Sequence, residues 1–221
     1  MYGLRKIRKD GKNDYNDFVW PLEVGAEVEA PDWNPELLMC SLPRVTGSWD
    51  LLYGDCWGVF EIEEKDIILI NNYIWKVRKC KIVFLSENPE GMLQFFDHEK
   101  FDSETAYNWA YHIGNQDIMI DKIVESEWAC RWAVNIGNKD IMINRITESR
   151  WAYFWARRLG DRDIMIDRIT DSTMAFLWTK FIGDKDIMIK KFPEMSVSEE
   201  TQPTYMLWKY EYEKEYEQNY T

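Results

Sequence analysis

The sequence lacks the long apolar stretches that cross or pass through membranes. It has no run of about 18 apolar residues. The first residues, Met1 to Lys6, have no apolar leader character. We therefore expect a soluble protein that stays where it is made, in the cytosol of a host cell, with no membrane partner.

Cysteine and histidine are scarce and badly spaced for chemistry. The four cysteines contain no C-x-x-C pair, which is typical of free thiols in a reducing compartment. His98 and His112 fit no zinc-ligand spacing, so we expect no metal site. The sequence contains no G-x-S-x-G, G-x-x-x-x-G-K-[ST] or G-x-G-x-x-G pattern, and we expect neither an enzyme nor a cofactor.

Two groups of polar residues, one at 61–66 and one near Gly54, could form functional sites. Glu61, Glu63, Glu64 and Asp66 could pair as catalytic carboxylates or hold a cation, but a solvated strand edge accounts for them better. Near Gly54, Asp50, Asp55 and Cys56 could line a pocket. The surrounding sequence offers no base that would activate the thiol.

Positive charge is also in short supply. Lys and Arg number 27 against 39 Asp and Glu, a net charge of −12. Binding to a nucleic-acid backbone needs a basic surface, so direct DNA or RNA binding is disfavoured. The excess lies in residues 1–101 and 193–221, whereas residues 102–192 are nearly neutral. Such flanks suit a basic protein partner, including one that itself binds nucleic acid, and they also serve plain solubility.

The dominant feature that is present is a 23-residue repeat in four copies. Glycine, tryptophan and aspartate recur at that spacing, and Asp-Ile-Met-Ile is unchanged in every copy. The equivalent residues are Gly114, Gly137, Gly160, Gly183; Trp109, Trp132, Trp155, Trp178; and Asp117, Asp140, Asp163, Asp186. A fixed period of this length predicts a stacked array in which each unit buries its apolar face against its neighbours.

The first copy shows how one unit folds. Ser103 is suited to cap a helix whose apolar stripe recurs at i, i+3, i+4 and i+7. Gly114 supplies the left-handed residue that ends this helix. We expect Asp117 to cap a second helix of one and a half to two turns, and Lys122 to meet the negative end of that helix. The array thus predicts a short, curved α-solenoid.

The unrepeated positions of each first helix are candidates for a binding surface. Trp and Arg are enriched there, and both are favoured in binding hot spots. The candidate protein-binding residues are Trp128, Arg131, Trp151, Phe154, Arg157 and Arg158. Two interpretations stay open: the aromatic side chains pack against the N-terminal domain or the tail, or they form a free binding face.

Residues 1–90 predict a compact α+β domain with a small mixed or antiparallel sheet. Strand patterns occur at 57–63, 66–71, 73–77 and 80–85, with Asn71-Asn72 as a hairpin turn. Two prolines fix a turn at 30–35. Residues 91–101 predict a linking or cap helix before the repeats at 102–192, and together these form the second domain, 91–192.

Residues 193–221 form an acidic, aromatic tail after Pro193. It is either a docked helix or a segment that orders on contact with a partner. We expect its first half to dock as a cap and residues 217–221 to be disordered.

The segment from Phe18-Val19-Trp20-Pro21 to Pro31-Asp32-Trp33-Asn34-Pro35 resembles the start of an uncharacterised domain of phage and mobile-element proteins. The resemblance covers about 85 residues and implies a phage or prophage source. That domain often carries Gly-Leu-His-Gly after the Asp-Trp-Asn-Pro turn, and the corresponding residues 40–54 here have no histidine.

These observations favour a non-enzymatic, phage-encoded inhibitor that occludes or sequesters a host defence protein such as a CRISPR nuclease. Two alternatives stay open. Residues 1–90 could be a degenerate ADP-ribosyltransferase-like domain with a pocket near 50–57 and the repeats as a targeting module. The chain could also be a structural scaffold that self-assembles.

Overall fold

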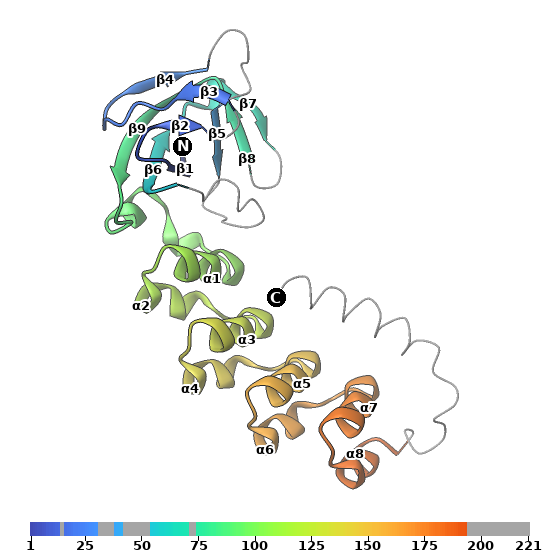
Figure 1. Cartoon of the computed structure of the whole chain (residues 1–221). Coiled ribbons are helices and arrows are strands. Elements are labelled where there is room, and N and C mark those ends of the chain that lie inside the picture. The colour runs from blue at the N-terminus through green and yellow to red at the C-terminus, as the bar shows by residue number, and fades with distance from the viewer. Residues whose placement is uncertain (14–15, 31–37, 42–53, 71–73, 194–221) are drawn as a thin grey trace. The chain divides into compact units, whose positions relative to one another are not determined.

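The computed structural model describes residues 1–13, 16–30, 38–41, 54–70 and 74–193. Within these residues an antiparallel sheet is combined with eight α-helices, so the predicted α+β class is confirmed (Figure 1). The chain divides into two compact units, Met1–Ile146 and Thr147–Thr221. The first holds the sheet and two helix pairs, and the second holds the other two pairs. The predicted domain boundary near residue 90 thus falls inside the first unit.

The sheet of the first unit has seven strands among the described residues, in the order β4-β9-β6-β1-β5-β8-β7. Each strand pairs antiparallel with its neighbours in this order. The strands are β1 (Tyr2–Ile7), β4 (Glu27–Glu29), β5 (Leu38–Ser41), β6 (Cys56–Glu61), β7 (Ile67–Ile70), β8 (Ile74–Val77) and β9 (Lys79–Ser86). A separate two-stranded sheet pairs β2 (Lys12–Asn13) with β3 (Asn16–Val19).

The sequence patterns found β6 to β9 but missed β1. This strand lies in the middle of the sheet and pairs with β6 from Tyr2↔Glu61 to Ile7↔Cys56. Basic residues interrupt the apolar pattern that would have predicted this strand. Arg5 is nevertheless buried, and its guanidinium lies 5.0 Å from the ring centroid of Trp20. A charge stacked on an aromatic ring is tolerated in the interior. Of the predicted turns, 71–72 and most of 30–35 lie outside the described residues.

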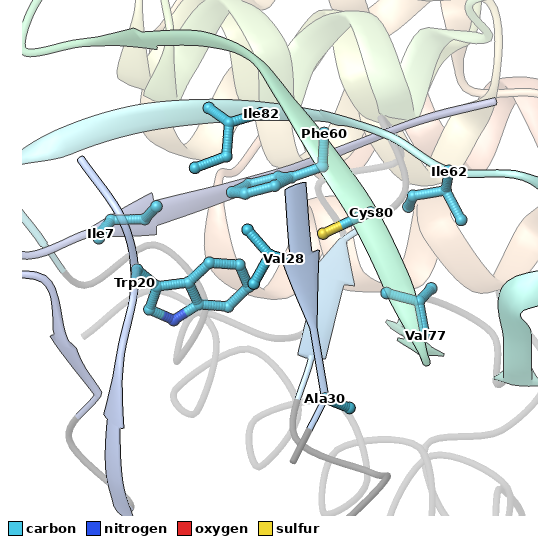
Figure 2. Packing of buried hydrophobic residues seen from close by; sticks show 9 residues of the cluster. All are labelled: Ile7, Trp20, Val28, Ala30, Phe60, Ile62, Val77, Cys80 and Ile82. Atoms are coloured by element: carbon cyan, nitrogen blue, oxygen red, sulfur yellow. The ribbon is translucent and has the colours of Figure 1, made fainter. Parts of the chain in front are cut away.

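A cluster of buried apolar side chains covers one region of the sheet (Figure 2). Trp20 packs beside Val28 and against Phe60, with the two ring centroids 5.2 Å apart. The remaining members of the cluster are Ile7, Ala30, Ile62, Val77, Cys80 and Ile82. The tryptophan of the Phe-Val-Trp-Pro motif therefore serves the core.

Each repeat forms one module of two helices. The long first helices are α1 (Ser103–His112), α3 (Ser126–Asn135), α5 (Ser149–Arg158) and α7 (Ser172–Phe181). The short second helices are α2 (Gln116–Met119), α4 (Lys139–Met142), α6 (Arg162–Met165) and α8 (Lys185–Lys191). In the first three modules a 3-10 turn extends the second helix, at Ile120–Lys122, Ile143–Arg145 and Ile166–Arg168. The predicted lengths are confirmed.

The turn between the two helices uses two left-handed residues in succession. Gly114 has φ 112° and Asn115 has φ 59°, and the other three modules repeat this pair with Asn or Asp in second place. Asn and Asp tolerate this conformation better than other residues with side chains. The N-cap of the second helix is consequently Asn115, and the expectation that Asp117 caps it is wrong. Asp117 lies in the first turn, where its charge favours the helix N-terminus.

A buried tryptophan links the two helices of each module. Trp109, Trp132, Trp155 and Trp178 are all 0% exposed. In three modules the indole N–H donates to the left-handed Asn or Asp after the glycine, at 3.1 Å for Asn115, 2.8 Å for Asp161 and 3.1 Å for Asp184. The indole nitrogen of Trp132 has no such bond among the described residues. Each module therefore closes around one large side chain.

The repeated serine acts differently from the cap that the sequence predicts. Asp102 is the N-cap of α1, and its carboxylate accepts from the amide of Thr105. Ser103 follows it and is 1% exposed. Its hydroxyl donates to the carbonyl of Lys122 and accepts from the amides of Val124 and Glu125. The serine thus fixes the end of its module, where the chain passes to the next one.

The repeated cation also acts between modules. Arg145 donates to the carbonyls of Ile120 and Ile123, which end the second helix of the preceding module. Lys191 donates in the same way to the carbonyls of Ile166 and Asp167. The cation does meet the negative end of a helix, but of the preceding module rather than its own.

The segment before the repeats differs from the single helix that the sequence predicts for 91–101. It consists of two 3-10 turns, Met92–Phe95 and His98–Lys100. It still covers the first module as expected of a cap. Phe96 and Phe101 pack on Trp109, with ring centroids 5.3 and 5.4 Å away.

Replacing the repeated serine should lower the stability of the fold only in modules where its hydroxyl bonds to the linker before the next module. The hydroxyl of Ser149 accepts from the amide of Thr170 at 2.7 Å and is bonded to its hydroxyl at 2.7 Å. We expect Ser149→Ala to lower the free energy of unfolding by about 1 kcal/mol, because the backbone amide of Thr170 loses its acceptor in a part-buried contact. Ser172, the equivalent residue of the last module, is the matched control, and Ser172→Ala should cost less than about 0.5 kcal/mol. Urea unfolding measures the loss of stability in both variants. Equal losses would contradict a stabilising role of the serine hydroxyl at the linker.

Candidate protein-binding surface

The six predicted binding residues do not form one described cluster. Trp128 and Arg131 lie on α3 in the first unit. The other four, Trp151, Phe154, Arg157 and Arg158, lie on α5 in the second unit. Each unit is therefore described with its own candidate surface.

We call the first surface the Trp128 patch; it consists of Tyr107, Tyr111, Trp128 and Arg131. Tyr107 lies against both other rings, with centroids 5.8 Å from Tyr111 and 5.3 Å from Trp128. The guanidinium of Arg131 covers Trp128 at 4.9 Å from the ring centroid. Tyr111 is half exposed, at 50%, and so offers an aromatic face to a partner.

Polar bonds hold the Trp128 patch in one arrangement. Glu127 accepts two hydrogen bonds from Arg131, at 3.1 and 2.8 Å. The amide of Asn135 donates to the hydroxyl of Tyr107 at 2.9 Å. Burial raises the pKa of Tyr107, which keeps its hydroxyl neutral. Side chains that are already fixed lose little conformational entropy when a partner binds.

Two predicted contact residues are buried in the second unit. Trp151 is 6% exposed and Phe154 is 4% exposed, and their rings pack 5.6 Å apart. Neither can offer a broad face to a partner in this conformation. The free-face interpretation does not describe these two side chains, whose rings pack on each other within α5.

We call the second surface the Arg157 patch; it consists of Arg157, Lys180 and Phe181. Phe181 is 43% exposed, and both cations lie over its ring, at 5.3 Å for Arg157 and 5.6 Å for Lys180. Arg157 also approaches the hydroxyl of Tyr153 at 3.4 Å. The exposed Arg158, the last residue of α5, lies next to it in sequence.

Sequence reasoning missed Tyr107, Tyr111, Lys180 and Phe181, although all four occupy unrepeated positions of the first helices. One isoleucine of the repeated Asp-Ile-Met-Ile sequence is exposed in every module. Ile118, Ile141, Ile164 and Ile187 recur in every copy yet are 43%, 45%, 48% and 53% exposed. A residue that repeats is therefore not always part of the core in this chain.

The acidic cluster lies in a groove of about 520 Å³ on the first unit. Its lining includes Glu61, Glu63, Glu64 and Asp66, together with Lys65, Lys79 and Lys81. Lys65 binds Glu63 at 2.6 Å, and this contact lowers the pKa of the carboxyl group. Among the described residues no group of acidic, histidine or cysteine side chains is placed to hold a metal ion. Lysine-paired carboxylates at a surface agree with a solvated strand edge.

Half of the proposed pocket near 50–57, namely residues 50–53, lies outside the described residues. Of its candidates, Asp55 accepts from the backbone amide of Lys9 at 2.9 Å. Burial raises the pKa of Cys56, and the nearby carboxylates of Glu87 and Asp55 add to the rise. The thiolate is therefore disfavoured at neutral pH.

Comparisons with protein-family models, with curated proteins and with solved structures returned no significant match. None of the helices in the described ranges has the length and apolar character needed to cross a bilayer.

A half-buried histidine beside the Trp128 patch makes the first unit sensitive to acid. The ring centroid of His112 lies 4.6 Å from that of Tyr111. Burial lowers the pKa of His112 to about 4, and the positive charge of Lys6 acts in the same direction. The folded state thus binds its proton less readily than the unfolded chain does. The free energy of unfolding therefore carries no penalty from His112 above pH 6.5, and it decreases as the pH falls from 6.5 towards 4.

We therefore expect His112→Gln to flatten the dependence of unfolding free energy on pH between 6.5 and 4. The change should be about 1–2 kcal/mol after allowance for solvent screening. Chemical unfolding at a series of pH values measures this change; identical slopes for His112→Gln and wild type would rule out this role.

Proposed function

We propose that this protein is a non-enzymatic binding protein that occludes or sequesters a host defence factor. The observation that carries the proposal is the Trp128 patch, where an arginine and three aromatic rings are fixed on a repeat frame. Trp, Tyr and Arg dominate binding hot spots, and prior ordering improves affinity. In this proposal Trp128 and Arg131 act together with Tyr111, whose ring is half exposed.

The proposal includes a continuous array. Within each unit the modules are joined by the same devices, a buried serine at the linker and a cation on the preceding helix end. We propose that these joints continue between the second and third modules and give one α-solenoid of four repeats. An extended surface of this kind is the usual binding platform of repeat proteins.

The proposed partner is a basic protein, such as a CRISPR nuclease with a nucleic-acid groove. The net charge of −12 favours encounter with a basic surface, and the rate of encounter should fall as salt is added. The likeness of residues 18–35 to a phage and mobile-element domain supports a phage origin by association alone. Arg158, which is exposed at the end of α5, belongs to the proposal as a contact of the second unit.

The test compares capture of defence proteins by the tagged full-length protein and its variants. We expect Tyr111→Ala and Arg131→Ala to weaken capture about tenfold or more, as hot-spot substitutions do. Ile118→Ala changes an exposed residue on the second helix of the first module and is the matched control. A lysate from a host that carries a CRISPR system supplies the partner, and mass spectrometry identifies it.

Loss of capture in both patch variants, with retention in the control, supports the proposal. Circular dichroism confirms that each variant is folded. Unchanged capture by the folded patch variants removes the Trp128 patch as the binding surface. Absence of any defence protein from the wild-type eluate argues against the proposed partner class.

A further inference from the structure

The Arg157 patch has the chemistry to bind an acidic, aromatic segment. Arg157 and Lys180 place two cations over the same exposed ring, that of Phe181. Both cations are themselves exposed, because each lies near the end of a first helix. A ring flanked by two cations can stack on another aromatic side chain while the cations bind carboxylates.

The charge of the surrounding unit points the same way. Residues 147–193 contain nine Lys and Arg against seven Asp and Glu, so this part of an acidic protein is slightly basic. Two of the seven carboxylates, Asp161 and Asp184, accept from the buried tryptophans of their modules. The opposite holds for residues 194–221, which contain two lysines against seven glutamates.

The tail has the composition that the patch would select. Tyrosine alternates with glutamate in the segment Tyr210-Glu211-Tyr212-Glu213, and Lys214-Glu215-Tyr216 follows. The tail begins directly after Pro193, and the preceding α8 belongs to the same unit as the patch. The ten residues 194–203 at the start of the tail can extend by about 33 Å, roughly twice the length of a ten-residue helix. Reach therefore does not limit contact.

We propose that residues 204–216 of the tail bind the Arg157 patch of the same molecule. Glutamate side chains of the tail bind Arg157 and Lys180, and a tail aromatic ring packs on Phe181. Tethering makes the contact intramolecular, so modest contacts suffice to keep it populated. The contact is independent of the partner proposed for the Trp128 patch, and either can fail alone.

Hydrogen–deuterium exchange of the full-length protein tests this contact. Backbone amides in residues 204–216 should exchange more slowly than those of an unstructured chain, at low protein concentration and low salt. In Arg157→Glu/Lys180→Glu their exchange should accelerate about tenfold, because two attractive pairs become repulsive. Added salt should accelerate exchange in the wild type as well.

A matched control separates this effect from a change in overall charge. Arg162→Glu/Lys185→Glu alters two exposed cations of the same unit on its second helices, and it should leave tail exchange unchanged. A charge swap adds specificity: Glu211→Lys, Glu213→Lys and Glu215→Lys, combined with Arg157→Glu/Lys180→Glu, should restore the protection.

Three results would overturn the proposal. They are unprotected tail amides in the wild type, protection that survives Arg157→Glu/Lys180→Glu, and protection that appears only as protein concentration rises. The third result would mean that the tail binds a second copy of the chain. Circular dichroism of each variant shows that the second unit remains folded.

Discussion

The buried tryptophan of each module is the constraint on which the rest of the repeat region depends. Two short helices cannot bury an apolar face alone, and α2 has only four residues before its 3-10 extension. A side chain that is 0% exposed, such as Trp155, gives the pair a common core. Its indole N–H also needs an acceptor, and Asp161 supplies one from a left-handed turn. The glycine, the Asn or Asp and the tryptophan thus act together to hold the two helices of a module.

Because these three residues hold the module together, the outward positions of the first helix are free to vary. Serine and cation joints connect neighbouring modules through backbone atoms, which every sequence provides. The outward positions of the first helices are then under no common packing constraint. They carry an aromatic cluster with Arg131 in the first unit and a cationic pair around Phe181 in the second. One frame can therefore present surfaces of different chemistry.

Periodicity in the sequence was enough to predict the helix pairs, their lengths and the left-handed glycines. It failed where tertiary contacts decide the role of a residue. Ser103 looks like a helix cap but bonds to a linker about twenty residues away, and Asp102 is the cap. In the sheet, the basic pattern of β1 concealed a central strand, since nothing local reveals that Arg5 stacks on Trp20. In the candidate site, residue type predicted Trp128 and Arg131, which the structure places in one cluster with Tyr107. It could not show that Trp151 turns inward or that Tyr111 stays half exposed.

Solvent exchange of the indole N–H protons, followed by nuclear magnetic resonance, tests whether the bonded tryptophans close their modules. The indole protons of Trp109, Trp155 and Trp178 should exchange far more slowly than that of the half-buried Trp128. Asp161→Ala should accelerate exchange at Trp155 and leave exchange at Trp178 unchanged. Equal exchange at Trp155 and Trp128, or no response to Asp161→Ala, would contradict the closure of these three modules around a bonded tryptophan.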